Sequence, residues 1–234
     1  MLTGPRSDEL LELFLAGTER QQLRCWAQLQ SQAFELRELI WERLLTQPRQ
    51  ANSWASGSLL RLLARDSEML AEIRIRFPRG WLPCPEGFAN LFEQLQDALL
   101  LEQLELSDRL TSSLLREMAG PEAVARGYVY FSEVANFKPN LLAHMDALWW
   151  LYSNGRFGFR VQKQLLSSVS GNWENLWQLI AWKANGVWTR YPKNFNWSHG
   201  APEGHMPLVN QLRGVRLLDA ILKHPGLDLG PGSA

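Results

Sequence analysis

Ten residues in the first half of the chain, Pro78 to Gly87, contain three prolines and two glycines. An α-helix does not continue through such a segment, because proline lacks the backbone donor and clashes with the preceding turn. On both sides of the segment, apolar residues recur at the spacing of amphipathic helices. We therefore expect an all-α protein in two parts, an N-terminal helical bundle at residues 1–83 and a core domain at residues 84–234.

The bundle is predicted to consist of short helices. Ser7 is a suitable N-cap for a helix that Gly17 ends, and Thr18 with Gln21 has the spacing of a capping box for the next helix. Pro48 ends a third helix, and the apolar residues of segments 59–63 and 69–75 predict two more. The bundle has no cluster of polar residues that indicates chemistry, so we expect it to be a packing or adaptor module.

The core domain changes character along its length. Asn185-Gly186 suits a type I′ turn, which predicts a hairpin in residues 182–189. Residues 191–207 hold three prolines and two glycines and are predicted to form a long loop, and long ordered loops are usually functional. Helices are expected at residues 88–99, 104–118, 143–152, 159–168 and 173–180, and from Leu208 to Leu222.

The charges are unevenly distributed, although 24 basic residues balance 24 acidic ones. Residues 86–129 hold eight acidic and three basic residues, whereas residues 130–223 hold ten basic and five acidic ones. Seven of the 11 tryptophans lie between residues 149 and 197. An anionic partner is therefore expected to bind within residues 130–223.

The sequence carries no persuasive enzyme signature. It has neither a phosphate-binding glycine-rich loop nor a dinucleotide fingerprint, and the spacing of its four histidines and two cysteines is not that of metal ligands. We expect no catalytic residues, no metal site and no catalytic cofactor. No apolar run reaches the ~18–20 residues of a membrane helix, and the N-terminus lacks a signal-peptide pattern, so we expect a cytoplasmic protein.

Two segments, residues 152–163 and 188–197, interleave aromatic rings with cations. Flat apolar faces with Arg or Lys at the rim suit a large planar ligand with anionic edges. They also suit single-stranded nucleic acid, although the balanced total charge disfavours that partner. The alternative is that the rings form the core of a helical protein-interaction adaptor without a small-molecule ligand.

These segments also carry ordered motifs, and with them the chain resembles the Genomes-Uncoupled porphyrin-binding family, the small regulators of magnesium chelatase. The resemblance covers about residues 90–225, and the bundle resembles the N-terminal extension of cyanobacterial members. The motifs are Leu148-Trp149-Trp150, Ser153-Asn154-Gly155-Arg156-Phe157-Gly158-Phe159, Val161-Gln162-Lys163, Ala181-Trp182-Lys183 and Ala201-Pro202-Glu203-Gly204-His205-Met206-Pro207.

The resemblance implies an all-helical core shaped like a cupped hand, which binds protoporphyrin IX and Mg-protoporphyrin IX without catalysis. It implies that the loaded protein stimulates magnesium chelatase in chlorophyll biosynthesis through the large porphyrin-binding subunit of that enzyme. We expect no nucleic-acid partner, and at most a peripheral association with thylakoid membranes.

The resemblance also implies which residues form the binding groove. Tyr191 departs from cyanobacterial relatives, which often have Trp at this position, and its hydroxyl needs a polar partner. The basic rim of the groove falls on Arg213 and Arg216. The candidate groove residues are Leu104, Phe131, Val134, Tyr191, Phe195 and Trp197.

Overall fold

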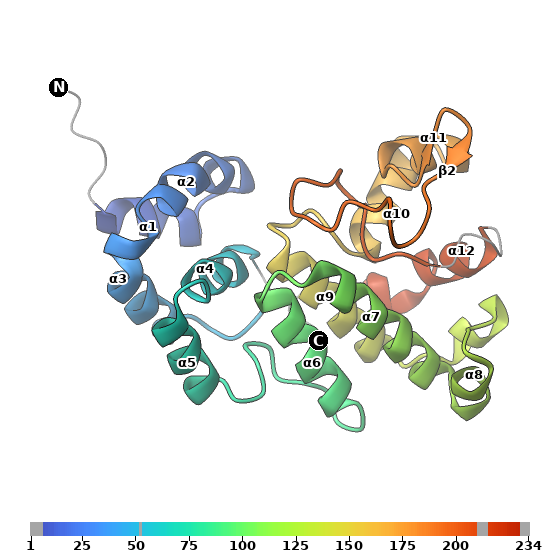
Figure 1. The fold of residues 1–234 in the computed structure, drawn as a ribbon, viewed down its shortest axis with the longest axis horizontal. Helices are drawn as coiled ribbons and strands as arrows, with labels where there is room; N and C mark the ends of the chain where they lie inside the picture. Colours follow the sequence, from blue (N-terminus) through green and yellow to red (C-terminus); the bar gives the residue numbers. More distant parts are fainter. Residues whose placement is uncertain (1–6, 52, 210–214, 230–234) are drawn as a thin grey trace.

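The computed structural model describes residues 7–51, 53–209 and 215–229, and helices dominate it (Figure 1). The prediction of an all-α fold is confirmed. The first part of the described chain consists of α1 (Ser7–Ala16), α2 (Glu19–Ser31), α3 (Ala33–Thr46), α4 (Ala55–Leu63) and α5 (Ser67–Arg76).

Aromatic rings pack in the interior of this bundle. Phe14 stacks on Trp26 and meets Trp54 edge-on, with ring centroids 5.6 and 5.5 Å apart. The Gln21 side chain accepts the backbone N–H of Thr18 at 2.8 Å, as expected for a capping-box residue at the start of α2. The predicted helix spacing thus produces a packed core of rings and leucines.

The second part of the chain forms a larger helical body. A short antiparallel hairpin lies within it, in which Lys183 pairs with Trp188 around Asn185-Gly186, as predicted. The elements are α6 (Ala89–Leu100), α7 (Leu104–Ala119), α8 (Pro121–Arg126), η1 (Phe131–Asn136), α9 (Pro139–Tyr152), α10 (Phe159–Ser168), α11 (Trp173–Leu179), β1 (Lys183–Ala184), β2 (Val187–Trp188), α12 (Arg216–Leu222) and η3 (Pro225–Leu227).

The predicted start of the last helix is wrong. α12 begins at Arg216, whereas Leu208 is not helical, and residues 210–214 lie outside the described residues. The backbone N–H of Leu208 donates to a carboxylate oxygen of Asp108 at 2.7 Å, so α7 holds this segment through a side chain. Helices α8 and η1 were not predicted, because six residues are too few for apolar periodicity to show.

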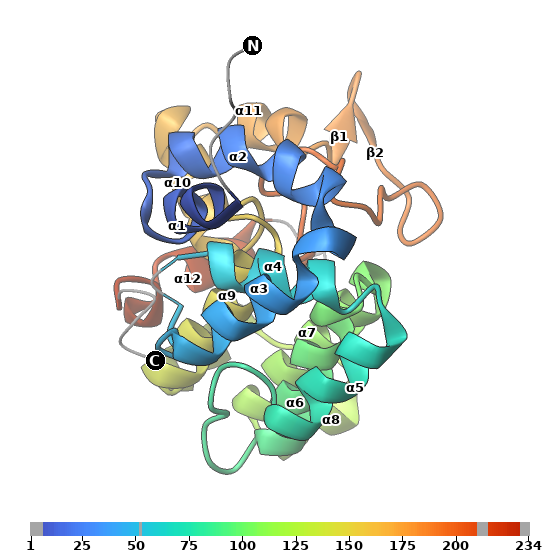
Figure 2. The ribbon, with the colours of Figure 1, turned by 90° about the vertical axis from the view of Figure 1, so that its left-hand side faces the viewer.

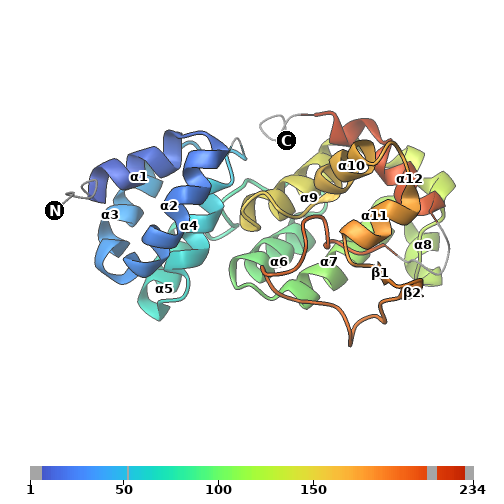
Figure 3. The same cartoon turned by 90° about the horizontal axis from the view of Figure 1, so that it is seen from above.

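Helix α9 organises the larger body. Eleven of its 14 residues are buried, and it contacts α4, α6 and α10 (Figure 3). Trp149 Nε1 donates to Thr111 Oγ1 at 2.8 Å, which ties α9 to α7. Asp146, fully buried, accepts the backbone N–H of Arg160 at 2.9 Å and pairs with its guanidinium, which ties α9 to α10. A helix buried on all sides needs such polar partners for its few charged groups.

The two parts meet where α4 packs against the end of α9. A Cβ on Gly57 would lie 2.4 Å from the carbonyl oxygen of Leu151, so glycine is required for this close approach. Figure 3 shows α1–α5 on one side of the molecule and α6–α12 on the other, and Figure 2 views the molecule from the bundle side. The bundle is therefore packed on the core through α4.

The segment between the two parts is pinned to both. Leu82 exchanges two hydrogen bonds with the Gln96 side chain, at 2.8 and 3.1 Å, and Arg49 donates to the carbonyl of Trp81. Trp81 and Leu82 are buried. The predicted domain boundary after residue 83 falls within this segment and stays a prediction.

Candidate functional site

A groove of about 800 Å³ lies between α7 and the chain that follows β2. Its volume is within the ~300–1,000 Å³ typical of small-molecule sites. The two sides of the groove come from different parts of the core domain. One side belongs to the acidic stretch at residues 86–129, and the other belongs to the basic, aromatic stretch at residues 130–223. The lining residues are Asp108, Arg109, Ser112, Ser113, Arg116, Trp188, Thr189, Arg190, Tyr191 and Leu208.

Two aromatic rings face this groove from the hairpin and the loop. Trp188 on β2 is 39% exposed and Tyr191 is 46% exposed. The hairpin is held by a row of indoles, because Trp177 stacks on Trp182 at 5.5 Å and contacts Trp188 at 5.6 Å. The buried rings of Trp177 and Trp182 thus hold the partly exposed ring of Trp188 in place.

Three guanidinium groups line the same groove, from Arg109, Arg116 and Arg190. Arg109 pairs with Glu105 one turn earlier on α7, and Arg116 donates to Ser113 at 2.9 Å. Guanidinium groups bind carboxylates in a planar, bidentate manner. The groove therefore combines apolar faces with groups that recognise anions.

Asp108 belongs to the lining of the same groove and is almost fully buried. Its carboxyl accepts the Leu208 N–H and bonds with the Tyr191 hydroxyl, which also contacts the Arg109 guanidinium. Burial raises the pKa of the Asp108 carboxyl to about 7, so much of it carries a proton near neutral pH. The Tyr191 hydroxyl has the polar partners that its position requires.

The structure brings only part of the predicted site to this groove. Of the predicted residues that it describes, Tyr191 is the one in the groove lining. Phe195 is buried beneath it, at 6.0 Å between ring centroids, and stacks on Trp197 at 5.5 Å. Leu104 and Val134 are buried in the core. None of the four residues Leu104, Val134, Phe195 and Trp197 is therefore part of the groove lining in this structure.

Phe131 and Arg216 form a separate pair where η1 packs against α12. Phe131 is 48% exposed, and the Arg216 guanidinium lies over its ring at 5.5 Å. Arg213, the other predicted rim residue, lies outside the described residues. The basic groups that line the groove in the described chain are instead Arg109, Arg116 and Arg190.

The sequence held a signal for the α7 side of the groove. Arg109, Ser112, Ser113 and Arg116 stand at positions i, i+3, i+4 and i+7, which share one face of a helix. The polar face of an amphipathic helix is ordinarily solvated, so this spacing by itself does not indicate a site. Nothing in the sequence shows that the hairpin packs opposite to it.

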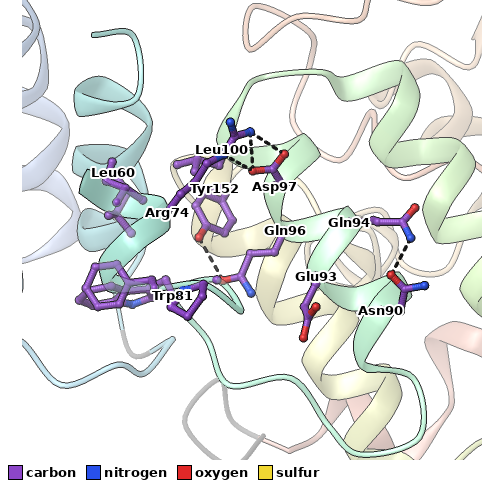
Figure 4. A pocket seen from close by; sticks show the side chains of 14 residues that line it. Leu60, Arg74, Trp81, Asn90, Glu93, Gln94, Gln96, Asp97, Leu100 and Tyr152 are labelled. Carbon is purple, nitrogen blue, oxygen red and sulfur yellow. Dashed lines mark hydrogen bonds and ion pairs between the residues drawn. The ribbon is translucent and has the colours of Figure 1, made fainter. Parts of the chain in front are cut away.

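A second pocket, of about 390 Å³, lies between α5 and α6 (Figure 4). Its polar groups pair with one another, since Arg74 pairs with Asp97 at 3.0 Å and Gln94 donates to Asn90 at 3.0 Å. The Tyr152 hydroxyl donates to Gln96 in the same way. The groove beside α7 is about twice as large and brings two half-exposed rings together with three arginines, so we take it as the candidate site.

The described residues give little support to a metal site or a membrane span. Among them, no three His, Cys, Asp or Glu side chains gather as a metal ion would require. Within the same ranges, none of the helices has the length and apolar character needed to cross a bilayer.

Comparison with known proteins identifies relatives of the core. The GUN4-like family model matches residues 88–225. The Ycf53-like protein of Synechocystis is 42% identical over 154 residues, which span 66% of this chain and 66% of that protein. The chloroplastic tetrapyrrole-binding protein of Arabidopsis thaliana is 34% identical over 146 residues, 58% of this chain and 55% of its own length.

A solved structure agrees with these relatives. The structure of GUN4 from Chlamydomonas reinhardtii superposes with a TM-score of 0.55 at 36% identity, covering 58% of this chain and 87% of that one. The family model spans more than half of the chain, and both the curated relatives and the solved structure fall in the same group. The resemblance indicated by the sequence motifs is thus confirmed, and the chain belongs to the GUN4-like family.

Proposed function

We propose that this protein binds a tetrapyrrole, without catalysis, in the groove between α7 and the chain after β2. The observation that carries the proposal is the coincidence of two half-exposed rings, Trp188 and Tyr191, with three guanidinium groups on one groove. The name of the Arabidopsis relative, a tetrapyrrole-binding protein, supports the choice of ligand.

The energetics of such a complex follow from its chemistry. A porphyrin is a flat macrocycle with two propionates on one edge. Burying roughly 200–300 Å² of its face at ~25 cal/mol per Å² contributes several kcal/mol before the costs of association. Solvent-exposed contacts between propionates and Arg109, Arg116 or Arg190 add orientation more than affinity. The rings would supply the binding energy, and the cations would select an anionic ligand.

The residues assigned by resemblance enter this proposal in two groups. We propose that Phe131 and Arg216, with Arg213, contact an edge of the ligand that extends beyond the groove lining towards α12; η1, which carries Phe131, packs against both α7 and α12. Leu104, Val134, Phe195 and Trp197 are proposed to shape the apolar wall behind it. The half-exposed ring of Phe131 beneath a guanidinium supports the first assignment.

The finer function rests on the family. We propose protoporphyrin IX and Mg-protoporphyrin IX as ligands, and stimulation of magnesium chelatase through its large porphyrin-binding subunit as the outcome. A cytoplasmic location, with at most peripheral contact to thylakoids, accompanies this role. The adaptor alternative requires the aromatic rings to serve only as core, and the exposure of Tyr191 and Trp188 on the groove weighs against it.

Titration with deuteroporphyrin tests the proposal. Trp188 lines the groove and contacts Trp177, so a bound porphyrin should quench tryptophan emission in a saturable manner. Tyr191→Ala should weaken the binding. Emission that stays unchanged at tens of micromolar ligand would contradict the proposal.

A further inference from the structure

The loop that carries Tyr191 also reaches the N-terminal bundle. Its residue His199 contacts Arg61 on α4, with 2.7 Å between Nε2 of the imidazole and Nη1 of the guanidinium. These two residues are 138 positions apart in sequence. The contact links the bundle to a wall of the groove.

Arg61 is almost fully buried and has partners at both of its terminal nitrogens. It is 3% exposed, and its Nη2 donates to Asn154 Oδ1 at the turn after α9. Ser58 on α4 donates to the same oxygen at 2.5 Å. A guanidinium has only donors, so His199 Nε2 must accept the bond and the imidazole is neutral, with its proton on Nδ1.

Burial and the neighbouring arginines favour this neutral form, whereas Glu102 opposes it. Glu102 lies 3.4 Å from Arg61 Nη1 and 3.9 Å from His199 Nε2, and it also pairs with the exposed Arg65 at 2.9 Å. Arg156 is the further cation that faces the imidazole. Burial, followed by the charge of Arg61, lowers the pKa of His199 to about 4.

The remainder of the loop is fixed at nearby points. The His199 ring stacks on Phe157 at 6.1 Å, and Arg156 donates to the carbonyl of Ala201 at 2.7 Å. Leu208 is bound to Asp108, as described above. The Tyr191 hydroxyl and the buried ring of Phe195 attach the start of the loop to the core, and His199 attaches the same loop to the bundle.

We propose that Arg61 is a positioning residue for the groove: by holding His199, it fixes the loop that carries Tyr191, and through it the N-terminal bundle sets the affinity for the ligand. This inference rests on the proposed function, since the affinity concerned is that for a tetrapyrrole. In the described chain, the bundle contributes no residue to the groove lining. The proposal gives the bundle an indirect part in binding.

The experiment uses the full chain and four single variants. Arg61→Met removes the guanidinium, and His199→Ala removes its partner from the loop side. His199→Gln keeps an acceptor for Arg61. Arg65→Met is the matched control, because Arg65 also pairs with Glu102 but is 56% exposed and lies on the outer side of the cluster.

Two quantities are measured on each variant. The first is hydrogen–deuterium exchange of the amides of Asn194 and Phe195 without ligand, and the second is the Kd for deuteroporphyrin from tryptophan quenching. We expect Arg61→Met and His199→Ala each to speed the exchange and to raise Kd about tenfold. Combining the two changes should add little, because both remove one interaction. His199→Gln and Arg65→Met should stay near the wild type.

Each outcome decides one claim. Unchanged loop exchange in folded Arg61→Met, or faster exchange with an unchanged Kd, would overturn the positioning role. If Arg61→Met does not fold, the comparison of His199→Ala with His199→Gln tests the same contact. A wild type that binds no porphyrin contradicts the proposed function, while loop exchange and the His199 proton NMR titration still report on the contact. In Arg61→Met, that titration should move from about pH 4 towards the usual value near 6.5.

Discussion

The bundle and the core both contain aromatic clusters, but they use them differently. In the bundle, Trp26 and Trp54 both pack on the buried ring of Phe14. In the core, the Trp177 row ends at Trp188, whose ring is 39% exposed on a groove with three guanidinium groups. The same residue types therefore serve stability in one region and, in our account, recognition in the other, and their exposure beside cations distinguishes the two.

The largest expected effect separates stability from binding. Phe14→Ala empties a fully buried site in the bundle, so it should lower the free energy of unfolding by about 3–5 kcal/mol. At a temperature where the variant is folded, its Kd for deuteroporphyrin should match the wild type. Tyr191→Ala should show the reverse pattern. Urea unfolding and fluorescence quenching on both variants check this, and an equal loss of affinity in both would break the comparison.

The next prediction concerns the buried carboxyl beneath the groove. The pKa of Asp108 is raised to about 7 in the folded protein, against about 4 in the unfolded chain. The folded state therefore keeps a proton that the unfolded state loses, so this group costs stability as pH rises from about 4 to 7. Relative to Asp108→Asn, the wild type should lose at most about 1.4 kcal/mol per pH unit in that window.

Urea unfolding of both proteins at several pH values measures that difference. Above about pH 7 the difference should level off. Two stability curves that run parallel from pH 4 to 7 would show that Asp108 is an ordinary carboxylate, and that the groove is not built over a desolvated acid.

The smallest effect tests the selection of an anionic ligand. Arg190→Ala should weaken binding of deuteroporphyrin by up to about fivefold, because exposed ion pairs contribute ~0.2–1 kcal/mol. Binding of its dimethyl ester, which has no carboxylates, should not change. Arg76→Ala on α5, an exposed cation of the bundle, is the control. Equal losses for acid and ester would remove the proposed role of the cation.

The sequence predicted the helices well because apolar periodicity and caps are local signals. The Thr18–Gln21 cap, the hairpin at Asn185-Gly186 and the aromatic segment around Tyr191 all appear where expected. The predicted start of the last helix at Leu208 is wrong because of a long-range contact. The Leu208 N–H donates to Asp108, which lies 100 residues earlier in the sequence.

The site was predicted less completely, and for the same reason. Arg109 and Arg116 share a helix face that is indistinguishable from a solvated one until the hairpin is placed opposite. Arg61 and His199 carry no pattern that links them across 138 residues. Tyr191, which the family resemblance predicted as a groove residue, is in the groove lining. Arg109 and Arg116 of α7 were not predicted and are seen only in the structure.

The most direct test of the central claim is a crystal structure of the full chain with a bound porphyrin. We predict that the macrocycle lies between α7 and the chain after β2, with a ring face on Tyr191 or Trp188 and a propionate on Arg109, Arg116 or Arg190. A macrocycle bound elsewhere, with this groove filled by side chains, would contradict the account.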